Sequence, residues 1–284
     1  MAVRLKNTEK AKDLFKGWDD AMFRACLEGS MGEVLVPEDA SETVGTDSEA
    51  GTDRAAGTDH AAGADCTGET SLRSACLHFA DFYLFGGKPD ARLLEIPMGI
   101  NSILTPADAA WEKLLSEHYP AEERAERYAI RKDTVFDREK LEALARQLPE
   151  GITLCRIDGK LYDRCMENPW SMDFVQTFPS KEAFLQKGLG IVAVRDGEIL
   201  AGCSSYARCS DAIEVEVDTR KDQRRQHLAT ACAAKLILLC LEQGLYPSWD
   251  AMNMESVGLE EKLGYRFSHA YSVYMRMDRT PGNC

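Results

Sequence analysis

The sequence lacks any long uninterrupted hydrophobic segment. Among its 284 residues, no apolar run approaches the ~18 residues that a membrane-spanning helix needs, and the N-terminus has no apolar signal core. Positive charge is also scarce, because 34 Lys and Arg stand against 47 Asp and Glu, which gives a net charge of −13. Nucleic-acid binding needs a basic face for phosphate contacts. These absences predict a cytoplasmic protein that binds neither membranes nor nucleic acid.

Cysteine pairs at metal-ligand spacing are absent as well. The ten cysteines are scattered, with no Cys-x-x-Cys pair and no histidine partner at the usual spacing. Several of them, such as Cys155, Cys232 and Cys240, lie inside apolar runs, where a thiol acts as a small hydrophobic group. We therefore expect reduced structural cysteines, and neither a disulfide framework nor a metal site.

The length and the 44% hydrophobic content are enough for two domains with their own cores. A degenerate six-residue repeat beginning Gly-Thr-Asp occupies residues 45–65 and has no apolar positions to bury, so residues 37–71 are predicted to be a disordered surface insertion. The break Leu148-Pro149-Glu150-Gly151 predicts a domain boundary. The expected organisation is an N-terminal α/β domain at 1–148, a second domain at 149–279 and a tail at 280–284.

The first half shows the periodicity of a small α/β domain. Apolar residues at helical spacing predict a helix over 8–28, and a short strand follows at 33–36. The apolar and aromatic segment 75–85 is expected to pair with that strand across the insertion. Further helices are predicted at 106–118 and 137–147.

The second half predicts a β-α-α-β-β-β-α-β-α-β order, which indicates a twisted mixed sheet flanked by helices. Asp196-Gly197 suits the tight turn of a hairpin between two of the strands. The expected strands are 152–157, 191–195, 198–206, 213–219, 248–251 and 270–277, and the expected helices are 160–166, 181–186, 224–243 and 256–263. The fold class is therefore mixed α/β.

Residues 213–229 are the most informative stretch. A strand alternating apolar and acidic residues is followed by a polar loop, a cationic turn and the start of a helix. A strand that delivers backbone amides to a helix N-terminus makes a site for a pyrophosphate. The acidic strand beside it supplies a proton acceptor. This pairing predicts acyl transfer from coenzyme A.

The same stretch resembles the GNAT superfamily of acetyl-CoA-dependent N-acetyltransferases. The superfamily's pyrophosphate motif is Arg/Gln-x-x-Gly-x-Gly/Ala, and the sequence here is Arg-Arg-Gln-His-Leu-Ala over 224–229, with His227 in place of glycine. The segment from Asn253 to Tyr265 is similar to the superfamily's Asn-x-x-Ser…Lys-Leu-Gly-Phe/Tyr segment. More specifically, Gly188-Leu-Gly190 and Ser204-Ser-Tyr206, among others, resemble a two-domain bacterial group similar to zwittermicin-resistance acetyltransferases.

The resemblance implies acetyl-CoA as co-substrate, with no metal, and it implies where the cofactor contacts lie. Backbone contacts fall on the acidic strand, pyrophosphate contacts on the loop and helix start, and pantetheine contacts on the later helix. The implied residues are Val217, Asp218, Thr219, Arg224, Arg225, Gln226, His227, Leu228, Ala229, Thr230, Asn253 and Ser256.

Amine acetylation needs a proton acceptor, and the acidic strand offers one. Glu214 and Glu216 share a strand face because side chains alternate, and their mutual repulsion raises the pKa of at least one. We favour Glu216 as the general base, with Glu214 close behind. The backbone N–H of Val217 is expected to hold the thioester carbonyl.

The proton donor to the departing thiolate is less defined by sequence. Many GNAT enzymes place a tyrosine in the helix after the Asn, but here that position is Glu260, which leaves the role unfilled. Tyr274, Tyr271 or Tyr206 are candidates to substitute, and Tyr274 is chosen. An acyl-cysteine route through Cys203 or Cys209 is the alternative chemistry.

The functional prediction is an N-acetyltransferase that moves an acetyl group directly to the amine of a small molecule, with a carboxylate as general base. The alternative is a non-catalytic GNAT-like module that binds coenzyme A or serves regulation. The sequence leaves open whether the protein forms a homodimer.

Overall fold

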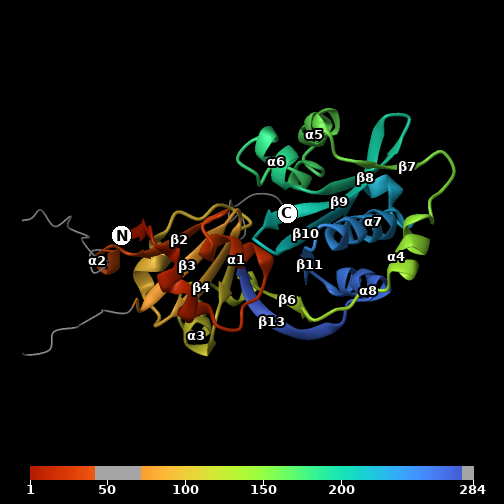
Figure 1. Cartoon of the computed structure of the whole chain (residues 1–284). Helices are drawn as coiled ribbons and strands as arrows, with labels where there is room; N and C mark the ends of the chain where they lie inside the picture. Colours follow the sequence, from red (N-terminus) through yellow and green to blue (C-terminus); the bar gives the residue numbers. More distant parts are fainter. Residues whose placement is uncertain (42–71, 277–284) are drawn as a thin grey trace, which may run out of the picture.

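The computed structural model describes residues 1–41 and 72–276. They form two mixed sheets with helices on their faces, so the predicted mixed α/β class is confirmed (Figure 1). The predicted repeat insertion lies outside the described residues, apart from 37–41, which end strand β2 (Glu33–Pro37) and form the short helix α2 (Glu38–Ser41).

The first sheet has eight strands in the order β1-β2-β3-β4-β5-β13-β6-β12. Its β2–β3 pairing confirms the predicted contact between the strand before the insertion and segment 75–85. Only β4 and β5 run parallel; the other neighbours are antiparallel. The remaining strands are β1 (Ala2–Arg4), β3 (Ser74–Phe79), β4 (Phe82–Gly87), β5 (Ile103–Pro106), β6 (Arg124–Ile130), β12 (Asp250–Ala251) and β13 (Phe267–Met275).

The second sheet has five strands in the order β11-β10-β9-β8-β7. Asp196 and Gly197, with φ of 50° and 80°, form the predicted hairpin turn between β8 and β9. β10 and β11 are parallel, and the other neighbours are antiparallel. The strands are β7 (Thr153–Arg156), β8 (Gly190–Arg195), β9 (Glu198–Arg208), β10 (Ala212–Thr219) and β11 (Tyr246–Ser248).

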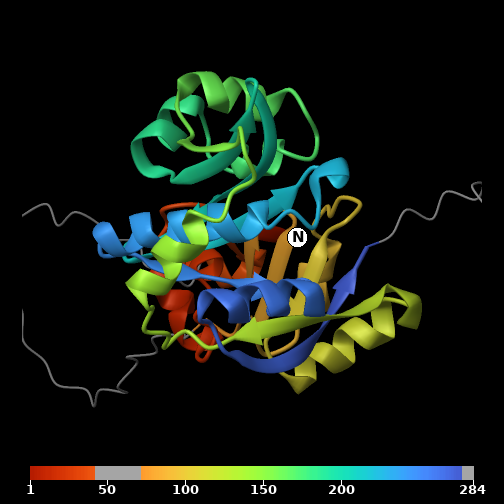
Figure 2. The same cartoon turned by 90° about the vertical axis from the view of Figure 1, so that its right-hand side faces the viewer.

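Helices cover both faces of the second sheet. Helix α7 (Leu228–Glu242), apolar all round, lies along one face beside α4 (Arg138–Ala145), and the sheet buries most of its side chains. Helices α5 (Gly159–Met166) and α6 (Lys181–Lys187) lie on the opposite side of this sheet (Figure 2). The other helical segments are α1 (Ala21–Leu27), α3 (Ala109–His118), α8 (Met254–Leu263) and the 3-10 turns Thr8–Phe15, Ala91–Glu95, Ala121–Glu123, Met172–Phe174 and Lys221–Gln223.

Several predicted elements differ from the structure. The helix expected over 8–28 is split, because Gly17 at φ 96° turns the chain between the 3-10 segment and α1. The helix expected from 224 begins at Leu228, so both arginines precede it. The strand expected over 248–251 is divided into β11 and β12, the segment 75–85 forms the two strands β3 and β4, and β1, β5 and β6 were not predicted.

The C-terminal strands do not stay with the second sheet. β13 lies between β5 and β6, and β12 lies at the edge beyond β6, so both complete the first sheet (Figure 1). The domain boundary at 148/149 stays a prediction, and segments from both sides of it share one sheet.

Within the described ranges, eight cysteines are free and no cluster of potential metal ligands occurs. None of the helices described here is both long and apolar enough to cross a bilayer.

Candidate active site

The strands β10 and β11 separate at the centre of the molecule. They pair over three residues only, and the pairing ends where Glu214 lies opposite Ser248. After Trp249 the chain passes to the first sheet as β12, while β10 continues to Thr219 paired with β9 alone. A register shift in β10 falls at the same place, between Glu214 and Val215. The segment that begins as β11 therefore leaves β10 and continues in the first sheet as β12. We call this divergence of β10 from β12 the fork, and beyond it one edge of β10 has no strand partner among the described residues.

The loop at the far end of β10 has the backbone of an anion site. Arg225 and His227 both have left-handed φ values, 62° and 61°. His227 is the N-cap of α7, and the first intrahelical bond is donated by the N–H of Ala231. The amides of Leu228, Ala229 and Thr230 therefore precede the helical hydrogen-bond ladder. Histidine thus keeps the left-handed conformation for which glycine is the default residue.

The side chains of this loop surround those amides with positive charge. Arg224, Arg225 and His227 are exposed, and Gln226 is partly buried. Arg224 lies 3.8 Å from the carboxylate of Asp218, whose Oδ1 accepts the Thr219 N–H at 2.6 Å. The predicted pyrophosphate residues are therefore together at one helix start, whereas Asp218 is already engaged.

Helix α8 follows the fork on its other side. Asn253 is its N-cap, and its side chain accepts the backbone N–H of Ser256 at 2.9 Å. The structure therefore gives Asn253 a capping role, and it places Ser256 partly buried in the first turn of the same helix.

Glu214 lies at the base of the fork. Its Oε2 accepts the N–H of Ala21 at 3.0 Å and the hydroxyl of Ser248 at 2.8 Å, while Oε1 is buried with no hydrogen-bond partner among the described residues. Burial raises the pKa of Glu214, and the carboxylates of Asp20 and Asp250 add to that shift.

Glu216 lies two residues further along, inside the fork, and is partly buried. Burial and the carboxylates of Asp173 and Asp218 raise its pKa to about 8, although Arg127 and the N–H of Val217 act in the opposite direction. The Val217 N–H is thus directed at the Glu216 carboxylate. Both predicted carboxylates lie at the divergence of the strands, but Glu214 is fixed by hydrogen bonds and Glu216 is the more accessible.

A set of six ionisable side chains, three of them buried and three partly buried, joins the two sheets beside the fork. We call it the charge cluster, and it comprises Asp20, Arg127, Lys132, Glu214, Asp250 and Glu260. Arg127 pairs with Asp250 at 2.5 Å, and Tyr271 donates to the other oxygen of that carboxylate at 2.8 Å. Lys132 pairs with Asp20 at 2.8 Å and donates to the carbonyl of Trp249 at 2.8 Å.

Glu260 is a member of the charge cluster to which the sequence analysis assigned no role. It is fully buried, and neither of its carboxylate oxygens has a hydrogen-bond partner among the described residues. Burial and the nearby Asp250 raise its pKa to about 9. Val257, Glu260 and Leu263 are spaced so that they share the apolar face of α8. This spacing was the signal in the sequence from which the burial of Glu260 could have been predicted.

The predicted proton donor Tyr274 lies elsewhere. Tyr271 and Tyr274 are three residues apart on β13, so they point to opposite faces of the first sheet. Tyr271 reaches Asp250, whereas Tyr274 is buried in a separate core cluster with Trp111 and Leu104. The structure therefore does not bring Tyr274 together with Glu214 and Glu216.

The surroundings of the two candidate cysteines do not support the acyl-cysteine route. Cys203 and Cys209 are buried, and burial raises the pKa of both thiols. A nucleophilic cysteine needs a thiolate, which these environments disfavour.

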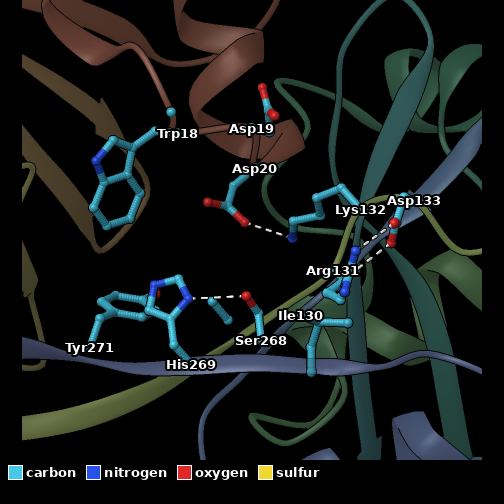
Figure 3. Close-up of a pocket in the computed structure, with 12 residues that line it drawn as sticks. Trp18, Asp19, Asp20, Ile130, Arg131, Lys132, Asp133, Ser268, His269 and Tyr271 are labelled. Atoms are coloured by element: carbon cyan, nitrogen blue, oxygen red, sulfur yellow. Dashed lines mark hydrogen bonds and ion pairs between the residues drawn. The ribbon is translucent and has the colours of Figure 1, made fainter.

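A cavity of about 450 Å³ opens on the side of the charge cluster that faces α1 (Figure 3). The Asp20–Lys132 pair forms part of its wall, and Trp18 packs edge-on against Tyr271 with ring centroids 5.5 Å apart. The neighbouring Arg131–Asp133 pair and the Ser268–His269 hydrogen bond complete the wall drawn in Figure 3.

Comparisons with known proteins identify chains with a similar fold. The chain resembles the Streptococcus suis 89/1591 crystal structure of a GCN5-related N-acetyltransferase-like protein, with a TM-score of 0.80, 37% identity, and coverage of 95% of this chain and 99% of that chain. A Drosophila protein of known structure shares the fold at 12% identity, with a TM-score of 0.52 and coverage of 97% of this chain and 98% of that chain. The fold is that of the GNAT-like acyltransferases.

The family is shown by sequence as well. A family model for GNAT acetyltransferases matches residues 59–274, so the chain belongs to that family, and its prediction as an acyltransferase is confirmed. YdfB of Bacillus subtilis (strain 168), an uncharacterized N-acetyltransferase, is 29% identical over 130 residues, which are 45% of this chain. The match spans about half of that relative, 49% of its length.

Proposed function

We propose that the protein transfers an acetyl group from acetyl-CoA directly to the amine of a small molecule, with Glu216 as general base. The observation that carries the proposal is the fork, because it places an unpaired strand edge and a carboxylate of raised pKa on the strand that leads to a cationic helix start. The proposal also includes that the chain groups with zwittermicin-resistance acetyltransferases and that the protein is cytoplasmic. The free state of the eight described cysteines supports the location.

The residues present fit the pyrophosphate and the pantetheine arm of coenzyme A. The amides at 228–230 and the exposed guanidinium of Arg225 would hold the pyrophosphate. The open edge of β10 offers Val217 and its neighbours to the arm, opposite Ser256 on α8. Acetyl-CoA supplies the activated acetyl group, and the protein supplies alignment, a proton acceptor and a hydrogen-bond donor.

Glu216 fits the role of base better than Glu214. A base needs an accessible oxygen and a pKa near the working pH. Glu216 has both, whereas both hydrogen-bond donors to Glu214 would be lost if that side chain turned toward a substrate. When Glu216 takes the amine proton, the N–H of Val217 becomes available to the carbonyl oxygen.

The acceptor is proposed to be a cationic amine, because carboxylates surround Glu216. Burial raises the pKa of the partly buried Tyr206, and the carboxylates of Glu216, of Asp81 on the turn between β3 and β4, and of Asp173 add to that shift. This acidic group attracts a protonated amine and then accepts its proton.

Replacing Asp81 with asparagine is therefore expected to raise the KM for the amine several-fold while leaving kcat close to that of the wild type. The matched control is Asp19→Asn, which removes an exposed carboxylate from the cavity of Figure 3 instead. Steady-state kinetics with a panel of amines measures both variants. A larger KM increase in the Asp19 variant would move the acceptor site to that cavity.

The left-handed conformation of His227 leads to a second prediction. His227→Gly is expected to bind coenzyme A as tightly as the wild type or a few-fold more tightly, because glycine adopts this φ freely. His227→Val is expected to bind about tenfold more weakly, because a β-branched side chain tolerates the left-handed conformation less well than histidine does. Isothermal titration calorimetry with coenzyme A distinguishes the two. Weaker binding by the glycine variant would instead make the imidazole a direct ligand.

The competing function is a GNAT-like module that binds coenzyme A without catalysis. The replacement of the usual glycine by His227 and of the usual tyrosine by Glu260 favours it. Thiol release from acetyl-CoA with a panel of amines, aminopolyols and amino acids decides between them. Saturable coenzyme binding without turnover would support the module, and absence of coenzyme binding would end both proposals.

A further inference from the structure

Three segments that are far apart in the sequence meet at Tyr206 on strand β9. The hairpin β3–β4 brings Phe79 and Phe82, whose ring centroids lie 5.5 and 6.0 Å from that of Tyr206. The segment before α6 is tied to the same residue, because the hydroxyl of Thr177 donates to the Tyr206 carbonyl at 2.5 Å. Strand β10 pairs with β9 and supplies Glu216. Tyr206 therefore marks the place where the hairpin, this segment and the acidic strand come together.

Each of the three segments carries one carboxylate to that place. Asp81 lies at the tip of the hairpin, Asp173 on the 3-10 turn before α6, and Glu216 on β10. Burial raises the pKa of Asp81, and the carboxylate of Asp173 adds to that shift. Asp173 likewise adds to the raised pKa of Glu216. Asp173 is thus within electrostatic reach of both other carboxylates.

This acidic group has no ion-pair partner in the described part of the chain. Asp81 is exposed, and Asp173 and Glu216 are partly buried. Arg127 lowers the pKa of Glu216, but its guanidinium is already paired with Asp250 at 2.5 Å. The three negative charges therefore exceed the positive charge that the protein itself provides, and they attract a cationic ligand.

A buried hydroxyl on the same face of the sheet also lacks a partner. Ser204 lies directly opposite Glu216 in the β9–β10 ladder, so the two side chains project from one face. Ser204 is fully buried, and its Oγ has no hydrogen-bond partner within residues 1–41 and 72–276. A buried hydroxyl without a partner costs free energy, and an N–H group of a ligand held by Glu216 would satisfy it. The face thus offers acceptors for a ligand rich in N–H donors.

We propose that the acceptor is a linear diamine, whose first amine binds at Glu216 and is acetylated while Asp81 and Asp173 hold its second ammonium group. The proposal rests on the proposed function and specifies its acceptor. One carboxylate is enough for a monoamine, whereas carboxylates brought by three separate segments match two ammonium groups. The rings of Phe82 and Tyr206 supply the apolar surface on which the methylene chain between the two amines packs.

The kinetic test compares diaminoalkanes of increasing length, each with the monoamine of the same length. The value of kcat/KM for the best diamine is expected to exceed that for its monoamine by about 10–100-fold, since a charge-assisted hydrogen bond contributes this much. Asp173→Asn is expected to remove most of this preference and to change the monoamine reaction much less. Asp163→Asn, which changes an exposed carboxylate on α5, is the matched control and is expected to keep the preference.

Two results of these assays would overturn the proposal. One is a wild type that uses the monoamine as well as the diamine at every length. The other is an Asp173→Asn variant that loses activity with both substrates equally, because that carboxylate would then act on the reacting amine or on the fold.

The product of the reaction gives a further check. After one transfer the diamine keeps a single ammonium group, so it can react again only as a monoamine does. Mass spectrometry with acetyl-CoA in excess is expected to show the monoacetylated diamine accumulating, with the second transfer about 10–100-fold slower. Equal rates for the two transfers would contradict a site for the second ammonium group.

Calorimetry separates this proposal from the proposed function. In the presence of coenzyme A, the diamine is expected to bind the wild type about tenfold or more tightly than the monoamine, and Asp173→Asn is expected to remove that difference. Failure of the proposed function would appear as a wild type that releases no thiol with any amine. Binding of the diamine that depends on Asp173 would still support the site in that case, and equal binding of the two amines would overturn it.

Discussion

Replacing Glu216 with glutamine is expected to lower kcat by about 10²–10⁴-fold, the usual contribution of a general base. Glutamine keeps the shape of the side chain but cannot accept the amine proton. The wild-type kcat is expected to rise as the pH rises through about 8, because Glu216 accepts a proton only when ionised. The variant is expected to lose this dependence. Thiol release measured across the pH range checks both the loss and the slope.

Two further variants make this result specific. Glu198→Gln, which changes an exposed carboxylate at the start of β9, is expected to keep the wild-type kcat. Glu214→Gln is expected to affect kcat less than Glu216→Gln, since Glu214 is buried and already accepts two hydrogen bonds. Retained turnover in both the Glu214 and Glu216 variants would remove the carboxylate base from the mechanism.

Replacing Arg127 with methionine is expected to lower the free energy of unfolding by about 3–5 kcal/mol, because it leaves the buried carboxylate of Asp250 without its cationic partner. The side chains of Arg127 and Asp250 are only 10% and 6% exposed, so water cannot replace the lost charge. Urea unfolding followed by circular dichroism measures the change.

The matched control for this prediction is an exposed ion pair in the same region. Arg131→Met breaks the Arg131–Asp133 pair, whose side chains are about half exposed, and is expected to cost no more than about 1 kcal/mol. The double variant Arg127→Met with Asp250→Asn is expected to recover part of the stability by removing the stranded charge. If the Arg127 and Arg131 variants were equally stable, the Arg127–Asp250 pair would not make the expected contribution to the free energy of unfolding.

The sequence predicted the elements whose signal is local. The alternation in 213–219 and the apolar run in the following helix are properties of consecutive residues, so β10 and α7 were predicted within a few residues. The loop between them was assigned to the helix because the left-handed backbone at Arg225 and His227 has no glycine to reveal it. The strand, the cationic turn and the helix start predicted its proposed function, and the resemblance to the family motif supported that prediction.

The elements that were missed depend on distant partners. β6 has three charged residues among seven, and it becomes a strand because β13 and β12 pair with its two edges. The charge cluster likewise combines side chains from the N-cap of α1, from β10, β12 and α8, and from β6 and the segment after it, so no local pattern contains it. Glu260 was visible as a departure from the family tyrosine, but its burial required the sheet that covers α8.

The insertion of β13 between β5 and β6 has a consequence for synthesis of the chain. The two strands that flank it are made more than one hundred residues earlier, and until residues 267–275 leave the ribosome each presents an unpaired row of amides and carbonyls. The N-terminal half expressed by itself would expose both rows and would be prone to aggregate. Supplying the missing strand as a separate peptide would be a direct way to rescue such a fragment.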